Sequence, residues 1–113
     1  QHIANLTQSH LMLRDPSMRS ATVMKLETAR LGRTLRLVEQ TVEGQDWLMA
    51  GGFSGVDCAV GWSVWTARRF VRLSPALEGY IDRCAERPAF RAALPGAGEP
   101  VLYDRDFYEL PDA

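Results

Sequence analysis

Few side chains in this 113-residue chain are of the types that do chemistry as nucleophiles, bases or metal ligands. Ser54 and Asp57, three residues apart, are of the types found in serine-based catalytic sites, but a serine nucleophile needs a base to activate it. The only histidines, His2 and His10, both belong to the first predicted helix. The two histidines and two cysteines have no spacing typical of a metal site. We therefore predict no catalytic residue and no metal ligand in this chain.

Ser54 and Asp57 are better explained as a structural helix cap. A serine at the N-cap accepts a hydrogen bond from a free N–H of the first turn, and Asp57 at the third helical position can accept from the N–H of Ser54. Phe53, just before the cap, is predicted to pack on Cys58 as a hydrophobic staple. Loss of the Asp57 carboxylate is expected to cost about 1–2 kcal/mol of stability.

Apolar residues recur at helical spacing along most of the chain, and no pair of strands is convincing. The predicted helices cover residues 2–13, 16–42, 55–71, 75–87 and 89–94. The third of these is apolar almost all round, which is typical of a central, buried helix. The sequence therefore predicts an all-α fold.

Three features of these helices give further expectations. Asp15 and Pro16 are predicted to cap and open the long second helix. Gly32, inside that helix, is expected to cost about 1 kcal/mol relative to alanine, and a close helix crossing is one reason to tolerate it. Trp62 and Trp65 are expected in the core, from which one of them can also border a pocket.

Composition and charge exclude several functional classes. The net charge of −1 gives no overall basic character that would suit nucleic acid. Asp57 and Arg68 interrupt the longest apolar stretch, so no membrane span is predicted. Cys58 and Cys84 lie in apolar helical patterns and are predicted to be buried free thiols, which indicates a reducing, cytoplasmic compartment. The chain opens at Gln1 inside a helical pattern, so we expect it to be part of a longer protein.

Three motifs follow one another in the segment 45–94. An acidic–aromatic–Leu stretch at 46–48 leads into a loop, and Phe-Ser-Gly-Val-Asp at 53–57 then opens the central helix. The next helix ends in the Arg87-Pro88 step before a short helix. In the order and spacing of these motifs the segment resembles the C-terminal all-helical domain of the glutathione S-transferases. The resemblance implies a helical bundle of that domain type over residues 1–94, followed by an extended acidic and aromatic tail over 95–113.

The same resemblance implies a two-domain parent enzyme whose N-terminal thioredoxin-like domain is absent from this chain. That domain would bind most of the co-substrate glutathione and carry the Tyr, Ser or Cys that activates its thiol. The reaction would be attack of the thiolate on a small electrophilic or hydrophobic substrate. This chain alone would not be catalytic. It would form the outer wall of the second-substrate pocket and contribute to a homodimer interface.

Eight residues are candidates for that hydrophobic pocket. They are Thr7, Gln8, His10, Leu11, Trp62, Trp65, Arg69 and Tyr108. The three polar residues of the first helix among them can equally lie on an exposed surface, and Arg69 can belong to a solvated helix end. The aromatic tail can close over the pocket, or pack on the missing domain or a neighbouring subunit.

A different class of function remains open beside the enzyme. The same helical domain also serves as a non-catalytic interaction or structural unit in transferase-like proteins. A free-standing bundle of four to five helices is a third reading. An upstream domain without a suitable Tyr, Ser or Cys near its first strand, or a stable dimer with no affinity for glutathione, would favour the non-catalytic unit.

Overall fold

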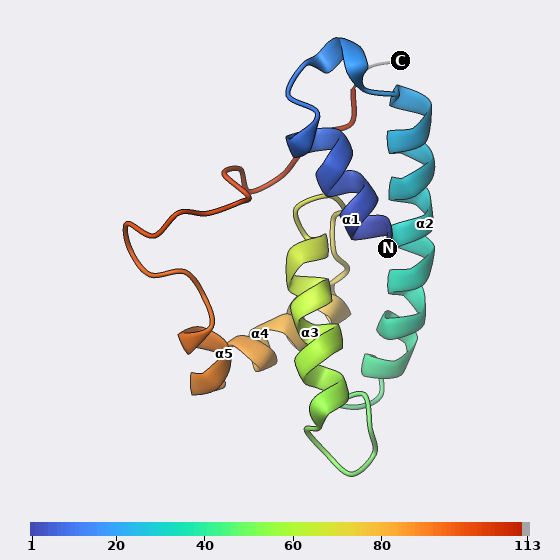
Figure 1. Ribbon diagram of the computed structural model, residues 1–113. Coiled ribbons are helices and arrows are strands. Elements are labelled where there is room, and N and C mark those ends of the chain that lie inside the picture. The colour runs from blue at the N-terminus through green and yellow to red at the C-terminus, as the bar shows by residue number, and fades with distance from the viewer. Residues whose placement is uncertain (112–113) are drawn as a thin grey trace.

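The computed structural model describes residues 1–111 and is helical, with no strand among them (Figure 1). The elements are α1 (His2–Thr7), a π-helix (Gln8–Met12), a 3-10 turn (Pro16–Met18), α2 (Ala21–Val42), α3 (Gly55–Ala67), α4 (Pro75–Ala85) and α5 (Pro88–Ala92). α1 packs on α2 and α3, and α4 packs on α2, α3 and α5. This arrangement confirms the predicted all-α helical bundle. None of these helices is long and apolar enough to cross a membrane.

The long helix α2 begins five residues later than predicted. Asp15 and Pro16 open only the short 3-10 turn, in which the Asp15 carboxylate accepts from the Ser17 N–H at 2.9 Å. Arg19 is extended, with φ −87° and ψ 142°, which breaks the helical path. Ser20 is the N-cap of α2 and accepts from the Val23 N–H at 3.2 Å. The chain therefore contains two cap signals in succession, and the second one starts the helix.

The start of α3 has the predicted cap. The Ser54 hydroxyl accepts from the Val56 N–H at 3.3 Å, and Asp57 accepts from the Ser54 N–H at 3.0 Å. Asp57 is only 1% exposed and accepts two further bonds, from the Leu48 N–H at 3.1 Å and the Tyr80 hydroxyl at 2.8 Å. One buried carboxylate therefore ties together the loop before α3, α3 itself and α4. Burial and this hydrogen bond raise the pKa of Tyr80.

One prediction at this end of α3 is wrong. Cys58 is exposed, so only Cys84 is a buried thiol. Phe53, the predicted staple residue, lies against the Trp47 ring, with centroids 5.1 Å apart, and under the Arg87 guanidinium at 3.5 Å. The loop from α2 thus supplies an aromatic partner for Phe53 that the local staple pattern did not include.

α3 is not buried on all sides. Its buried residues Asp57, Gly61, Val64 and Ala67 form one face. Trp62, on another face, is 41% exposed, and the helix ends at Ala67 instead of near residue 71. The prediction of core tryptophans is therefore wrong for Trp62. An all-round apolar pattern here means one buried face and one apolar face open to the surface.

The close helix crossing occurs at Gly61 and not at Gly32. A Cβ added at Gly61 would lie 2.8 Å from the Cys84 Sγ, whereas nothing lies within 4 Å of a Cβ at Gly32. Gly61 lets α3 approach α4, whose buried face consists of Leu77, Tyr80, Ile81 and Cys84.

Because Gly32 meets no neighbour, Gly32→Ala is expected to stabilise the protein by about 0.5–1 kcal/mol, since alanine loses less backbone entropy in a helix. Thermal unfolding followed by circular dichroism should show a melting temperature a few degrees higher. An unchanged or lower melting temperature would mean that Gly32 has a packing role that the structure does not show.

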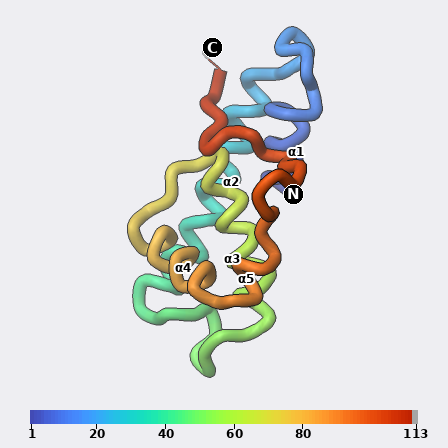
Figure 2. Tube along the Cα trace, turned by 90° about the vertical axis from the view of Figure 1, so that its left-hand side faces the viewer, coloured from blue at the N-terminus to red at the C-terminus, as the bar shows by residue number. Residues whose placement is uncertain are grey.

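After α5 the chain has no helix up to residue 111, as predicted for the tail, whose last two residues lie outside the described part. The tail runs away from the bundle and then returns past α1 toward the beginning of α2 (Figures 1 and 2). Tyr108 is only 4% exposed and joins the core, with its N–H donating to the Arg69 carbonyl at 2.8 Å. The returning tail therefore packs on the chain's own helices.

Candidate functional site

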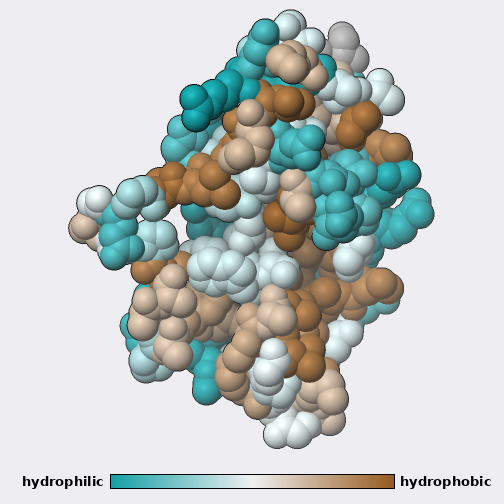
Figure 3. Space-filling view, viewed as in Figure 1, coloured by the Kyte–Doolittle hydropathy of each residue, from teal (hydrophilic) through white to brown (hydrophobic). Residues whose placement is uncertain are grey.

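Two open grooves lie on either side of the returning tail. The first, called here the tryptophan groove, measures about 1130 Å³ and lies between α1, α3 and the tail. The second, the arginine groove, measures about 900 Å³ and lies between the π-helix, the start of α2 and the tail. Val101 and Leu102 line both grooves, so the tail is their shared wall. Figure 3 shows hydrophobic residues at the surface along this returning segment.

The structure distributes the eight candidate pocket residues between these grooves. The tryptophan groove contains Thr7, Gln8, Trp62, Trp65 and Arg69. The arginine groove contains His10, Leu11 and Tyr108. Residues 54 to 62 positions apart in the sequence thus share one groove, while Gln8 and His10, only two positions apart, line different grooves.

The tryptophan groove has aromatic walls held by α5. The Phe90 ring lies 5.6 Å from the Trp62 ring and 5.4 Å from the Trp65 ring. The Arg68 guanidinium covers the Trp65 ring at 4.1 Å. These contacts hold both tryptophan side chains in place. Trp62, which lines the groove, is still 41% exposed. The groove therefore offers a large, preformed apolar surface.

Polar groups at the tail side of this groove are tied to one another. The Thr7 hydroxyl donates to the Ile3 carbonyl and shares a 2.8 Å hydrogen bond with the Tyr103 hydroxyl. Arg69 donates to the Arg105 carbonyl at 2.5 Å. Thr7 and Arg69 therefore fasten the tail across the helices, and the side chains that remain for a ligand here are mainly apolar.

The arginine groove surrounds His10, which lies in the π-helical turn after α1. π-Helical turns are often found at functional sites. The His10 ring is 9% exposed and packs 5.4 Å from the Phe70 ring and 5.7 Å from the Tyr108 ring. Burial, followed by the positive charges of Arg19 and Arg105, lowers the pKa of His10. All three effects favour the neutral imidazole.

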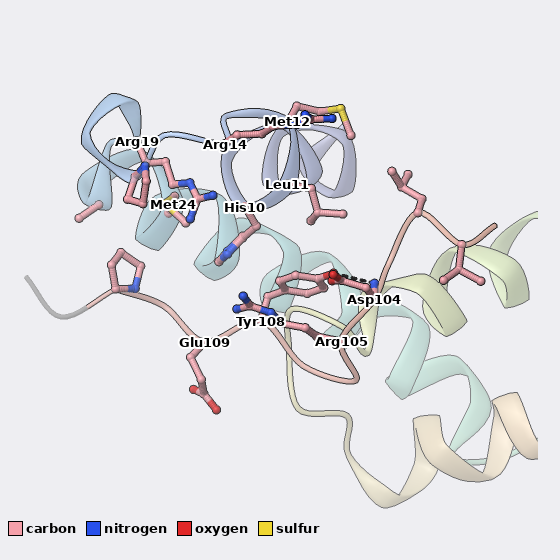
Figure 4. Close-up of a pocket in the computed structure, with 15 residues that line it drawn as sticks. His10, Leu11, Met12, Arg14, Arg19, Met24, Asp104, Arg105, Tyr108 and Glu109 are labelled. Carbon is pink, nitrogen blue, oxygen red and sulfur yellow. Dashed lines mark hydrogen bonds between the residues drawn. The ribbon is translucent and has the colours of Figure 1, made fainter.

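Two arginines belong to this groove that the sequence did not single out. Arg19 is held by a 2.7 Å hydrogen bond from its Nε to the Leu13 carbonyl. The Arg105 guanidinium lies 5.6 Å from the centre of the Tyr108 ring. Figure 4 shows both guanidinium groups beside His10, on opposite sides of its ring. The two arginines are 86 positions apart in the chain, so no spacing rule joins them.

The residues considered above for serine or metal chemistry do not come together in a site within residues 1–111. Ser54 and Asp57 are committed to the cap of α3. No group of three or more His, Cys, Asp or Glu residues within 1–111 is placed to hold a metal ion. What the grooves can do is bind: one presents aromatic surface and the other presents positive charge.

Comparison with protein-family models, with curated proteins and with solved structures found no match for this chain.

Proposed function

We propose that this chain is the second-substrate half of a glutathione transferase-type enzyme, and that the tryptophan groove binds an organic electrophile. The observation that carries the proposal is the gathering of Thr7, Gln8, Trp62, Trp65 and Arg69 around one groove with mainly apolar walls. Small-molecule sites are concave and mostly apolar, with a few polar groups that orient the ligand. The capping box and the short helix after Arg87-Pro88 support the same family.

Within this proposal the chemistry is divided between two domains. A thioredoxin-like domain outside this chain binds glutathione and lowers the pKa of its thiol, which makes the thiolate the nucleophile. The tryptophan groove holds the electrophile beside it, and the parent protein acts as a homodimer in the cytoplasm. The free thiols Cys58 and Cys84 suit that reducing compartment.

The proposal can be tested by calorimetry, which measures the affinity of the full-length gene product for glutathione and for an S-alkyl glutathione. The alkyl group should bind against Trp62, so the S-alkyl form should bind more tightly than glutathione itself. Trp62→Ala should weaken the binding of the S-alkyl form about tenfold and leave the affinity for glutathione unchanged, because only the alkyl group contacts the groove.

Met49→Ala is the control, since Met49 is also an exposed apolar residue (52%) and does not line the groove. It should leave both affinities unchanged. No binding at millimolar glutathione would overturn the enzyme proposal. A stable dimer with that result would instead support the non-catalytic interaction domain.

A further inference from the structure

The arginine groove carries positive charge that the described part of the chain does not neutralise. Arg14, Arg19 and Arg105 line it, and none of them forms an ion pair within residues 1–111. Two acidic residues also line the groove, Asp104 and Glu109. A third carboxylate, Asp15, lies nearby, and hydrogen bonds from Ser17 and, to a smaller extent, the charge of Arg19 lower its pKa. The balance of charge therefore depends on how these three carboxylates are placed relative to the arginines.

Neither Asp104 nor Glu109 forms an ion pair with Arg14, Arg19 or Arg105, and Asp15 accepts from the N–H and the hydroxyl of Ser17. Asp104 accepts from the Tyr108 hydroxyl at 2.8 Å, and its own N–H donates back to that hydroxyl at 3.0 Å. Glu109 lies 3.5 Å from the Arg72 guanidinium, and Figure 4 shows its carboxylate pointing away from His10. The space around His10 therefore has two guanidinium groups and no facing carboxylate from these residues.

We propose that the arginine groove binds the carboxylate of a small amphipathic molecule between Arg19 and Arg105, beside His10. Guanidinium groups are well suited to carboxylates because they donate paired hydrogen bonds in a planar fork. Leu11 and Met12 line the same groove and offer apolar surface for the rest of the ligand. About 900 Å³ is the size of an ordinary small-molecule site. The site needs nothing outside this chain and does not depend on glutathione.

Occupation of this site should change the titration of His10. In the empty groove, burial, Arg19 and Arg105 all favour the neutral imidazole. A bound carboxylate adds a negative charge that favours the imidazolium, so the pKa of His10 should rise on binding. By linkage the ligand should bind more tightly as the pH falls through the pKa of His10 in the complex.

Decanoate below its micelle concentration is the probe, and decanol is its uncharged match. We expect proton NMR of the purified protein to show saturable binding of decanoate and a raised pKa of His10, with little binding of decanol. The ring signal of His2, which lies against Glu27 at 2.6 Å, is the internal reference and should not respond. Equal binding of decanol, or an unmoved His10 signal, would overturn the proposal.

Arg105→Gln is the main variant, because Arg105 is exposed and its side chain is not needed for the Arg69 contact with its carbonyl. It should weaken decanoate binding about tenfold, the cost of losing one charged hydrogen-bond partner. Arg19→Gln should do the same. Arg14→Gln removes an equal charge from a residue whose side chain runs toward Met12 in Figure 4, and should change the affinity less than twofold.

Similar losses of decanoate affinity in the Arg14 and Arg105 variants would mean that binding depends only on the overall charge of the protein. That result would contradict a site between Arg19 and Arg105. Inorganic phosphate tests whether the anion alone is sufficient. It should compete only weakly, because it leaves the apolar walls uncovered. Phosphate binding as tight as that of decanoate would overturn the assignment of an amphipathic ligand.

Discussion

Replacing Asp57 by alanine is expected to destabilise the protein by about 3–5 kcal/mol, well above the cost of an ordinary cap. The carboxylate accepts from the Ser54 N–H, the Leu48 N–H and the Tyr80 hydroxyl, and it is almost fully buried. Its removal leaves these donors without their acceptor in a site that has little access to water. Each unsatisfied buried group costs about 1–3 kcal/mol.

Such a loss is a large fraction of the roughly 5–15 kcal/mol that stabilises a typical domain. Urea unfolding followed by circular dichroism should show a midpoint at much lower urea, with the slope m unchanged if the two states keep their exposed areas. The melting temperature should fall by more than about 10 °C, given roughly 4 °C per kcal/mol for a domain of this size.

Two variants separate this network from general effects. Asp82→Ala removes an exposed carboxylate from α4 and should change the stability by less than about 0.5 kcal/mol. Ser54→Ala removes the hydroxyl of the cap alone and should cost about 1 kcal/mol. If Asp57→Ala cost no more than Ser54→Ala, the bonds to Leu48 and Tyr80 would contribute nothing measurable.

The helix starts could be predicted because their signals are local. Ser54 caps α3 as expected, and Ser74 caps α4 in the same way, since a hydroxyl and the N–H that it satisfies lie two or three residues apart. The start at Pro16 could not be separated from the true start after Ser20 by the same rule. Both positions carry valid cap residues, and the extended conformation of Arg19 between them decides the outcome.

The exposure of α3 could not be predicted, because its pattern does not say which apolar face is covered. Trp62 and Val64 are both apolar, but Val64 is 1% exposed and Trp62 is 41% exposed. The difference depends on where α4 and the tail pack. Sequence periodicity identifies a helix with several apolar faces, and only the tertiary contacts choose the buried one.

The grooves depend on contacts between distant parts of the chain. Thr7 meets Tyr103 across 96 positions, and Arg69 meets the Arg105 carbonyl across 36. The tail was expected to act as a lid or to pack on another domain or subunit, with no partner specified. Its return across α1 decides that Arg105 lies beside His10, so the charged groove had no signal in the sequence.

Replacing Gly61 by valine is the second substitution with a large expected effect, a loss of about 3 kcal/mol. Even the first side-chain carbon would lie 2.8 Å from the Cys84 Sγ, and valine adds two methyl groups to it. Tyr80 and Cys84 are both buried on the facing side of α4, so they have little room to move. Forcing extra methyl groups into a packed core costs about 1–3 kcal/mol and sometimes more.

Gly32→Val is the matched control, because it makes the same change inside a helix where no atom lies within 4 Å of the new Cβ. Valine is a slightly better helix former than glycine, so this variant should be neutral or slightly stabilised. Equal losses in the two valine variants would assign the effect to β-branching in a helix and not to the α3–α4 contact.

A double-mutant cycle tests the contact between Gly61 and Cys84 directly. Gly61→Ala combines a gain in helix propensity of about 1 kcal/mol with the overlap against the Cys84 Sγ. Cys84→Ala removes that sulfur and leaves a small cavity. If the sulfur is the obstacle, the double variant should be more stable than the two single effects predict, by about 1 kcal/mol in the cycle. If the two single effects on stability simply add, α3 and α4 must shift apart to relieve the overlap. The close crossing would then tolerate a larger residue at position 61 than its geometry suggests.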